Sequence, residues 1–413
     1  MLLYITYLFC SPILWIIVII GSIFNTKIRA NYLSFWSQLK HIQSCLKNNK
    51  KEIYLFHAAS AGEFEQLQPI LRLINRNKYY IIVSFTSSTI FSQQKDSKLA
   101  DHICYHPFDL FWQSYLFFKI INPTKYIITR HDIWPNHIMI ASYLQIKVYF
   151  INANIHCNSI WNNRYLSTLT NLLFSKFEYI LVPSKQIFNK IKNNKIKNLK
   201  INIYPDSRID QILYKYHHNQ LSMPQRIDKK LTTIFASIDQ FDEEVIFNAL
   251  EKKYTNGSID LEKKQEYLIF VPHEPDVHAI NRLVRKLHKY QFTFKYIDDI
   301  NESNQSHVIV INKVGILSDL YNFTSKAYVG GGFSRGVHSI LEPAIYNCNI
   351  AYGPNIEMLD EAKQLSEAKQ ALIINNTDEM YAFLDAPFKD RNLFQTIFKT
   401  SNSSSNILNK IVQ

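Results

Sequence analysis

The stretch IYLFHAASAGE, residues 53–63, places a short apolar run directly before small residues and a glutamate. The run is typical of a buried strand, and Gly62 and Glu63 open a helical pattern that continues to Ile74. Further apolar runs of strand length follow, each separated by a helical length, at residues 79–85, 126–129, 147–152 and 179–182. Strands that alternate with helices are typical of βαβ units, so the pattern predicts a parallel sheet.

A second alternating series follows a polar segment. Residues 217–230 are polar and contain a proline, which predicts a linker. The runs after this segment lie at 232–236, 266–271, 292–296, 307–311, 327–329 and 350–352. We therefore expect two doubly wound, Rossmann-like α/β domains, residues 25–216 and 231–413. In such folds ligands bind beyond the carboxyl ends of the strands, which predicts a site in an interdomain cleft.

The composition narrows the class of protein. The chain has 413 residues, 47% of them hydrophobic and 19% charged, which excludes a disordered or fibrous protein. Its formal net charge of +12 favours anionic partners. The aromatic residues lie largely in apolar strands, which disfavours a nucleic-acid surface. Five scattered cysteines without C-x-x-C spacing exclude a disulfide scaffold and a zinc site built from cysteines.

The first 24 residues contain no charged side chain, and such a length just suffices to span a bilayer core. Lys27 and Arg29 follow, so the positive-inside rule predicts that the rest of the chain is cytoplasmic. We expect residues 1–24 to form an N-terminal membrane anchor helix. Pro12 and Gly21 leave open whether this segment spans the bilayer or lies in its interface.

Two ionisable groups follow strands of the first domain. Glu63 stands after the first strand, where a carboxylate can act as general base for a hydroxyl nucleophile. The alternative is a capping role at the helix start, with Ser60 as N-cap. Arg130 and Asp132 follow the strand at 126–129 and either contact a polar acceptor or form a salt-bridged turn.

Two further groups follow strands of the second domain. His273 and Glu274 lie between two prolines and are candidates for contact with a sugar or phosphate. The stretch VGGGFSRGVHSILE, residues 329–342, predicts a glycine turn and then a helix that carries His338 and Glu342 on one face. The start of that helix would bind phosphate with help from Arg335, and Glu342 would hold a ribose. The alternative is a tight loop explained by packing alone.

With these motifs in order, nearly the whole chain resembles the 3-deoxy-D-manno-octulosonic acid (Kdo) transferases of lipid A biosynthesis, which are glycosyltransferases of the GT-B architecture. The similar segments are His57–Glu63, Arg130–Asn136, Pro272–Pro275, Val314–Tyr321, Gly330–Glu342 and Gly353–Asn355. The chain departs from the family pattern at four positions. Arg130 replaces an acidic residue, His273 and Asn154 replace arginines, and Ser339 replaces an asparagine.

The resemblance implies inverting transfer of Kdo from CMP-Kdo to a lipid A precursor (lipid IVA), with Glu63 as catalytic base. It implies no cofactor and no metal, in agreement with the absence of an Asp-x-Asp element. Its implied partners are CMP-Kdo, the lipid A precursor and anionic lipids, at the cytoplasmic face of a bacterial inner membrane. The implied acceptor-binding residues are Ser60, Gly62, Arg130 and Asp132. The implied donor-binding residues are His273, Glu274, Gly315, Ile316, Gly331, Gly332, Arg335, His338, Ser339 and Glu342.

Two alternatives stay open at this point. One is a membrane-associated GT-B enzyme that uses another nucleotide sugar. The other is a degenerate, non-catalytic relative that binds anionic lipid.

Overall fold

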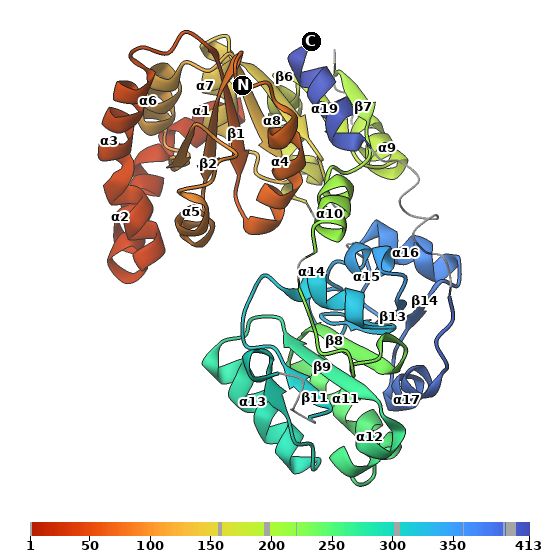
Figure 1. The fold of residues 1–413 in the computed structure, drawn as a ribbon. Coiled ribbons are helices and arrows are strands. Elements are labelled where there is room, and N and C mark those ends of the chain that lie inside the picture. Colours follow the sequence, from red (N-terminus) through yellow and green to blue (C-terminus); the bar gives the residue numbers. More distant parts are fainter. Residues whose placement is uncertain are drawn as a thin grey trace. The chain divides into compact units, whose positions relative to one another are not determined.

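The chain folds into two α/β units (Figure 1). The computed structural model describes residues 2–155, 159–193, 199–219, 221–300, 306–357, 359–390, 393 and 402–413. The first unit comprises Met1–Gln211 with Ser401–Gln413, and the second comprises Ile212–Thr400. The prediction of two α/β domains is confirmed. Cys157, one of the five cysteines, lies outside the described residues.

The first unit is built on a seven-stranded parallel sheet of order β3-β2-β1-β4-β5-β6-β7. Its strands are β1 (Glu52–Ala58), β2 (Tyr79–Phe85), β3 (His102–Tyr105), β4 (Lys125–Thr129), β5 (Lys147–Ile151), β6 (Phe177–Val182) and β7 (Ile201–Ile203). Its helices are α1 (Leu2–Phe9), α2 (Ser11–Phe24), α3 (Thr26–Leu46), α4 (Ala61–Leu73), α5 (Ser88–Gln94), α6 (Phe111–Ile121), α7 (Pro135–Tyr143), α8 (Ser167–Phe174), α9 (Lys185–Asn193) and α19 (Ser403–Val412). Helix α10 (Arg208–His217) contains the boundary between the units.

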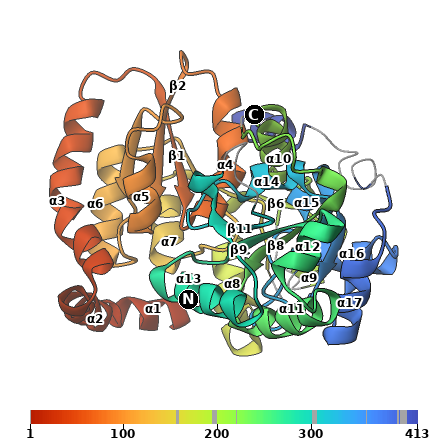
Figure 2. The ribbon, with the colours of Figure 1, turned by 60° about the horizontal axis from the view of Figure 1, so that its bottom comes forward.

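Alternating side chains of the strands fill two separate cores. Leu55 and Ile82 pack with α3 and α6 on one face, whereas Phe56 and Ile81 pack with α4 on the other. Figure 2 shows α3 and α6 on one side of β1 and β2, and α4 on the opposite side. Because both faces are covered, the central residues of these strands are apolar on both sides, as the sequence pattern predicts.

The second unit repeats this plan with a parallel sheet of order β10-β11-β9-β8-β12-β13-β14. Its strands are β8 (Thr232–Ile238), β9 (Tyr267–Pro272), β10 (Lys295–Tyr296), β11 (Val308–Val310), β12 (Lys326–Val329), β13 (Asn349–Tyr352) and β14 (Ala371–Ile373). Its helices are α11 (Gln240–Lys253), α12 (Ser258–Lys264), α13 (Val277–Lys289), α14 (Leu317–Leu320), α15 (Leu341–Ile345), α16 (Asp360–Glu367) and α17 (Thr377–Asp385). Helices α11, α12, α13 and α17 cover one face of this sheet.

The end of the chain returns to the first unit. Helix α19 belongs to the first unit (Figure 1). Its side chains Ile407 and Ile411 are fully buried in the core that α4 forms with the sheet. The backbone N–H of Ser404 donates to Asp210 at 2.6 Å, and Lys125 donates to the carbonyl of Ile411. The expected second domain, residues 231–413, therefore extends too far, because the apolar face of α19 is buried against α4.

The linker also differs from the expectation. The division between the units falls after Gln211, before the predicted linker at 217–230. Within that segment, Asn219 donates to the carbonyl of Asp319 and to the hydroxyl of Tyr346, both at 3.1 Å. These bonds fix the segment on the second unit.

The apolar N-terminus forms two helices rather than one. Helices α1 and α2 are bent by 42° relative to each other, at a break next to Pro12, which stands in the first turn of α2. Proline has no N–H to donate and therefore favours the start of a new helix. Among the described residues no single helix is long and apolar enough to cross a membrane, although this bent pair together meets that criterion. The expected single anchor helix over residues 1–24 is not supported.

Replacing Ile407 with alanine tests the attachment of α19. We expect Ile407→Ala to lower the free energy of unfolding of the first unit by about 2–4 kcal/mol, because it leaves a cavity in a closed core. Urea unfolding followed by tryptophan fluorescence reports on this unit, since Trp15, Trp36, Trp112, Trp134 and Trp161 all lie in it. Asn406→Ala, at an exposed position of the same helix, is the control. Equal midpoints for both variants would show that α19 adds nothing to this core.

Candidate active site

The first two sequence motifs meet at one edge of the first sheet. Strand β1 pairs in parallel with β4, so the segments that follow the two strands leave the sheet at the same end. Glu63 follows β1 in the first turn of α4, and Asp132 follows β4. Both carboxyl groups are largely shielded from solvent, and the charge of Asp132 raises the pKa of Glu63.

A buried histidine joins the two strand ends. His57, in β1, is fully buried, and its Nε2 lies 2.5 Å from Oδ2 of Asp132. The other oxygen of Asp132 accepts a hydrogen bond from the Trp134 indole at 2.6 Å. Burial raises the pKa of Asp132, but the hydrogen bonds from His57 and Trp134 and the charge of His57 outweigh it. The net effect lowers the pKa of Asp132, so this carboxylate stays ionised.

For Glu63 the effects that raise the pKa outweigh those that lower it. Its side chain is 5% exposed, and its Oε2 accepts a hydrogen bond from the backbone N–H of Ala59 at 2.5 Å. Burial raises the pKa of Glu63 most, the bond from Ala59 lowers it, and Asp132 raises it further. The net pKa is raised, which gives the basicity that a general base needs.

The capping alternative for this motif also holds. Ser60 is the N-cap of α4, and its hydroxyl accepts from the backbone N–H of Glu63 at 3.4 Å. Glu63 satisfies the N–H of Ala59, as a residue of the first turn commonly does. Capping and basicity are compatible here, because the cap fixes the carboxylate at the strand edge. Gly62 is exposed, and no atom lies within 4 Å of the position that a Cβ would take.

Arg130 lies beside this cluster. It adopts a left-handed backbone conformation, φ 66°, at the end of β4, and its Nε donates to His131 at 3.1 Å. Its positive charge lowers the pKa of Glu63, though less than burial raises it. Arg130 therefore stands near enough to influence the candidate base. Asp132 is not part of a simple turn, since its partner His57 lies in another strand.

Polar residues behind His57 form a buried chain that the sequence analysis missed. The Ser84 hydroxyl lies 3.2 Å from Nδ1 of His57 and 2.9 Å from Nδ1 of His106. Nε2 of His106 in turn lies 3.0 Å from Nδ1 of His137. Burial lowers the pKa of both His106 and His137, so they are neutral. The signal in the sequence was polar residues at the ends of otherwise apolar strands, in IYLFHA and YYIIVSF.

In the second unit the glycine motif forms a tight loop after β12. A Cβ on Gly332 would lie 2.5 Å from the Cα of Gly353, and Gly331 has a φ of 87°. The backbone N–H of Asn355 donates to the carbonyl of Gly332 at 2.9 Å, which joins this loop to the turn after β13. The packing alternative for this motif therefore explains at least Gly332.

A carboxylate that the sequence analysis missed holds this loop. Asp242 of α11 accepts hydrogen bonds from the N–H of Gly331 and the hydroxyl of Tyr328, both at 2.8 Å. Burial is the main reason why the pKa of Asp242 rises to about 6. Asp239, the N-cap of α11, forms a capping box with Asp242. The Asp-x-x-Asp spacing after a strand was the available signal.

The structure brings His273 and His338 together. Their rings stack with centroids 4.1 Å apart and planes at 17°. Burial and the nearby His273 lower the pKa of His338 to about 4, so its imidazole is neutral. The motif after β9 and the motif after β12 thus contribute to one surface, as the adjacent positions of β9, β8 and β12 allow.

The prediction that a helix carries both His338 and Glu342 is wrong. Helix α15 begins only at Leu341 and has five residues, so His338 lies in the preceding loop and shares no helix face with Glu342. No helix N-terminus directly follows Gly331 and Gly332, because the chain turns there to pack against Gly353. Glu342 stands in the first turn of α15, and its charge acts on the buried Tyr321.

The remaining donor candidates lie around these loops. Arg335 and Glu274 are exposed, and Gly315 has a φ of 94° with no atom within 4 Å of the position that a Cβ would take. Ile316 is the N-cap of the four-residue helix α14. The buried Oγ of Ser339 has no hydrogen-bond partner among the described residues.

Comparisons with known proteins find the same family that the motifs resemble. Residues 34–211 match the family described as 3-Deoxy-D-manno-octulosonic-acid transferase (kdotransferase). A 3-deoxy-D-manno-octulosonic acid transferase of Aquifex aeolicus is 26% identical over 330 residues, covering 79% of this chain and 82% of that protein. One of Rickettsia felis is 24% identical over 341 residues, covering 80% of this chain and 70% of that protein.

Solved structures show the same fold at lower sequence identity. The crystal structure of a UDP-N-acetylglucosamine 2-epimerase aligns with a TM-score of 0.61 at 13% identity, covering 88% of this chain and 96% of that chain. This likeness concerns the fold alone. It fits two parallel-sheet α/β domains of the kind found in GT-B glycosyltransferases.

The raised pKa of Glu63 predicts a pH-dependent effect of Glu63→Gln on stability. A carboxyl whose pKa is raised in the folded state stabilises the fold below its ordinary pKa of 4.5, and that contribution is lost as the pH rises through the folded-state value. The glutamine variant does not ionise. We therefore expect its free energy of unfolding to gain on wild type as the pH rises from about 4 to about 7. Urea unfolding followed by tryptophan fluorescence measures both free energies. A glutamine variant that loses stability relative to wild type over that range would contradict the raised pKa of Glu63.

Proposed function

Because this chain is a homologue of the Kdo transferases, and therefore a glycosyltransferase, we propose that it transfers Kdo from CMP-Kdo to a lipid A precursor with inversion at the anomeric carbon. The resemblance drawn from the motifs is confirmed by relatives that cover most of the chain. The observation that carries the proposal is the buried carboxylate of Glu63, with its raised pKa, beside the ionised Asp132 at one strand edge.

In the proposed reaction, Glu63 removes the proton from an acceptor hydroxyl as that oxygen attacks the anomeric carbon of Kdo. The bond from the anomeric carbon to the phosphate oxygen breaks, and CMP leaves with the electron pair. Asp132, held by His57 and Trp134, cannot take this proton easily, because its pKa is lowered. We assign Asp132, Arg130, Ser60 and Gly62 to the acceptor, since they surround Glu63 on the same strand ends.

We assign the donor to the loops of the second unit. Arg335 is exposed and free to pair with the phosphate of CMP, and the stacked His273 and His338 supply hydrogen-bond donors or acceptors. We assign Glu342, in the first turn of α15, to the ribose of the donor. The further donor residues proposed are Glu274, Gly315, Ile316, Gly331, Gly332 and Ser339. The transfer step itself is proposed to need no metal and no cofactor.

We propose that the enzyme works at the cytoplasmic face of a bacterial inner membrane. Helix α2 supports this, since Ile13, Ile16, Ile17, Ile20 and Ile23 are exposed on it and form an apolar surface. Lys27 and Arg29 follow directly, and the net charge of +12 suits anionic lipid and a phosphorylated acceptor. The pair α1 and α2 would then enter the lipid as one bent element.

Kdo transfer is tested with purified full-length protein, CMP-Kdo and tetraacyl lipid A precursor in detergent. We expect CMP release and a gain of whole Kdo masses in the lipid. Glu63→Gln should lower kcat/KM by about a hundredfold to ten-thousandfold, because the general base is lost. Glu65→Gln, two residues further along α4, is the matched control. Activity that survives in a folded Glu63→Gln would exclude Glu63 as base. Transfer from UDP- or ADP-sugars, and not from CMP-Kdo, would show that the donor is another nucleotide sugar.

The role of Arg335 is tested by its removal. Arg335→Ala should raise the KM for CMP-Kdo about tenfold with little change in kcat, since the arginine binds the donor phosphate in ground and transition states alike. Arg285→Ala removes an equally exposed charge from α13 of the same unit and serves as control. Equal KM values for the two variants would show that Arg335 does not bind the donor.

A further inference from the structure

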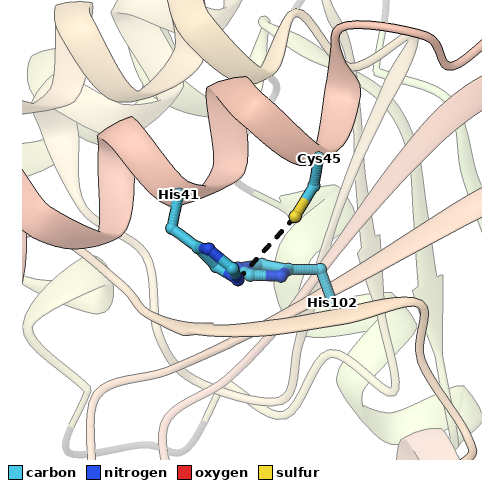
Figure 3. Close-up of side chains that lie close together, drawn as sticks. All are labelled: His41, Cys45 and His102. Atoms are coloured by element: carbon cyan, nitrogen blue, oxygen red, sulfur yellow. Dashed lines mark hydrogen bonds between the residues drawn. The ribbon is translucent and has the colours of Figure 1, made fainter.

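Three side chains with metal-binding atoms converge on the outer edge of the first sheet, away from Glu63. His41 and Cys45 stand four residues apart on α3, and His102 opens the edge strand β3 (Figure 3). One imidazole nitrogen of each histidine and the Cys45 sulfur all lie within 4.8 Å of one another. Nε2 of His41 is 3.7 Å from Sγ of Cys45, and the two imidazole centroids are 5.2 Å apart.

The backbone that carries these groups is firmly held. Leu39 and Ile42 of α3 are buried against the sheet. The side chain of Gln38 accepts from the N–H of Tyr105 in β3 at 2.6 Å, and Asn31 donates to the carbonyl of His106 at 3.1 Å. These two bonds fix α3 to β3 and to the residue that follows this strand, next to the cluster. Ligands that project from such elements are positioned more precisely than ligands on loops.

The spacing of the donor atoms fits a tetrahedral ion. With Zn–S of about 2.3 Å and Zn–N of about 2.0 Å, sulfur and nitrogen ligands of tetrahedral zinc lie about 3.5 Å apart. The 3.7 Å between Nε2 of His41 and Sγ of Cys45 is close to this value, and the donor atoms of all three residues lie within 4.8 Å of one another. His41 and Cys45 are exposed and His102 is half-buried, so a metal ion can reach all three.

We propose that His41, Cys45 and His102 bind one Zn²⁺ ion, which ties helix α3 to the edge strand β3. Two imidazoles and a thiolate form a nitrogen–sulfur donor set that suits zinc, and water completes the fourth position. Asp101, the nearest acid in sequence, is already paired with Arg76 at 2.7 Å and with the N–H of Ile81. Binding releases the thiol proton of Cys45 to solvent and involves no change of oxidation state.

This site is separate from the proposed chemistry. Strand β2 lies between β3 and β1, the strand that precedes Glu63. The ion would therefore act on the packing of α3, the helix that directly follows α1 and α2, and take no part in the transfer step. The proposal goes beyond Kdo transfer and does not depend on it.

The test uses tag-free, full-length protein in detergent, stripped with a chelator and titrated with Co²⁺ and then Zn²⁺. We expect one equivalent of Co²⁺ to produce a thiolate-to-metal charge-transfer band and the visible bands of a tetrahedral site, both removed by Zn²⁺. Competition against a chromophoric chelator should show zinc binding weakened at least about tenfold in Cys45→Ser and in His41→Gln. Both positions are exposed, so these variants should keep the metal-free unfolding midpoint of wild type.

Cys10→Ser provides the matched control, because Cys10 is a free cysteine outside the cluster. It should retain the charge-transfer band and the wild-type zinc affinity. Zinc should also raise the unfolding temperature of wild type and of Cys10→Ser, but not that of Cys45→Ser. Absence of a stoichiometric band, or equal zinc affinity in wild type and Cys45→Ser, would overturn the proposal, even if Kdo transfer is observed.

Discussion

The hydrogen bond between His57 and Asp132 ties the candidate site to the fold. His57 has no access to water, so its two ring nitrogens must find partners within the protein. One partner is the carboxylate of Asp132, at 2.5 Å, and the other is Ser84, across the β1–β2 pairing. The loop after β4 is thereby held against the end of β1. Without this bond a buried imidazole would be left unsatisfied, at a cost of about 1–3 kcal/mol.

The hydrogen bond from His57 also helps to give two neighbouring carboxyl groups different pKa values. Asp132 receives hydrogen bonds from His57 and Trp134 and has a lowered pKa, whereas Glu63 is dominated by burial and has a raised pKa. Pairs of carboxyl groups that are driven apart in this way commonly divide their roles in an active site. In the second unit Asp239 has a lowered pKa and Asp242 a raised one, but there the pair caps α11 and holds the glycine loop. A perturbed carboxyl alone therefore does not identify a catalytic group. The family match covers residues 34–211, a segment that contains Glu63 but neither Asp239 nor Asp242.

The long, apolar strands were predictable from the sequence because both faces of each parallel sheet are buried. The short strand β3 was not, since only His102–Tyr105 pair with β2 and the run is partly polar. The return of α19 to the first unit depends on packing between segments far apart in the chain, which no local pattern reports. The helix expected to carry His338 fails because the contact of Gly332 with Gly353 forces a loop. Among the candidate site residues, Glu63 and Asp132 followed from their positions after strands, whereas the bond between Asp132 and His57 required the structure.

The pH dependence of kcat/KM for Kdo transfer by the wild-type enzyme tests the central claim most directly. This profile reports the ionisation of essential groups in the free enzyme. Because the pKa of Glu63 is raised, we expect activity to rise with pH through a single titration that lies above the ordinary carboxyl value of 4.5. A profile that stays flat down to that value, in protein shown to remain folded, would contradict the assignment of a buried Glu63 as the base.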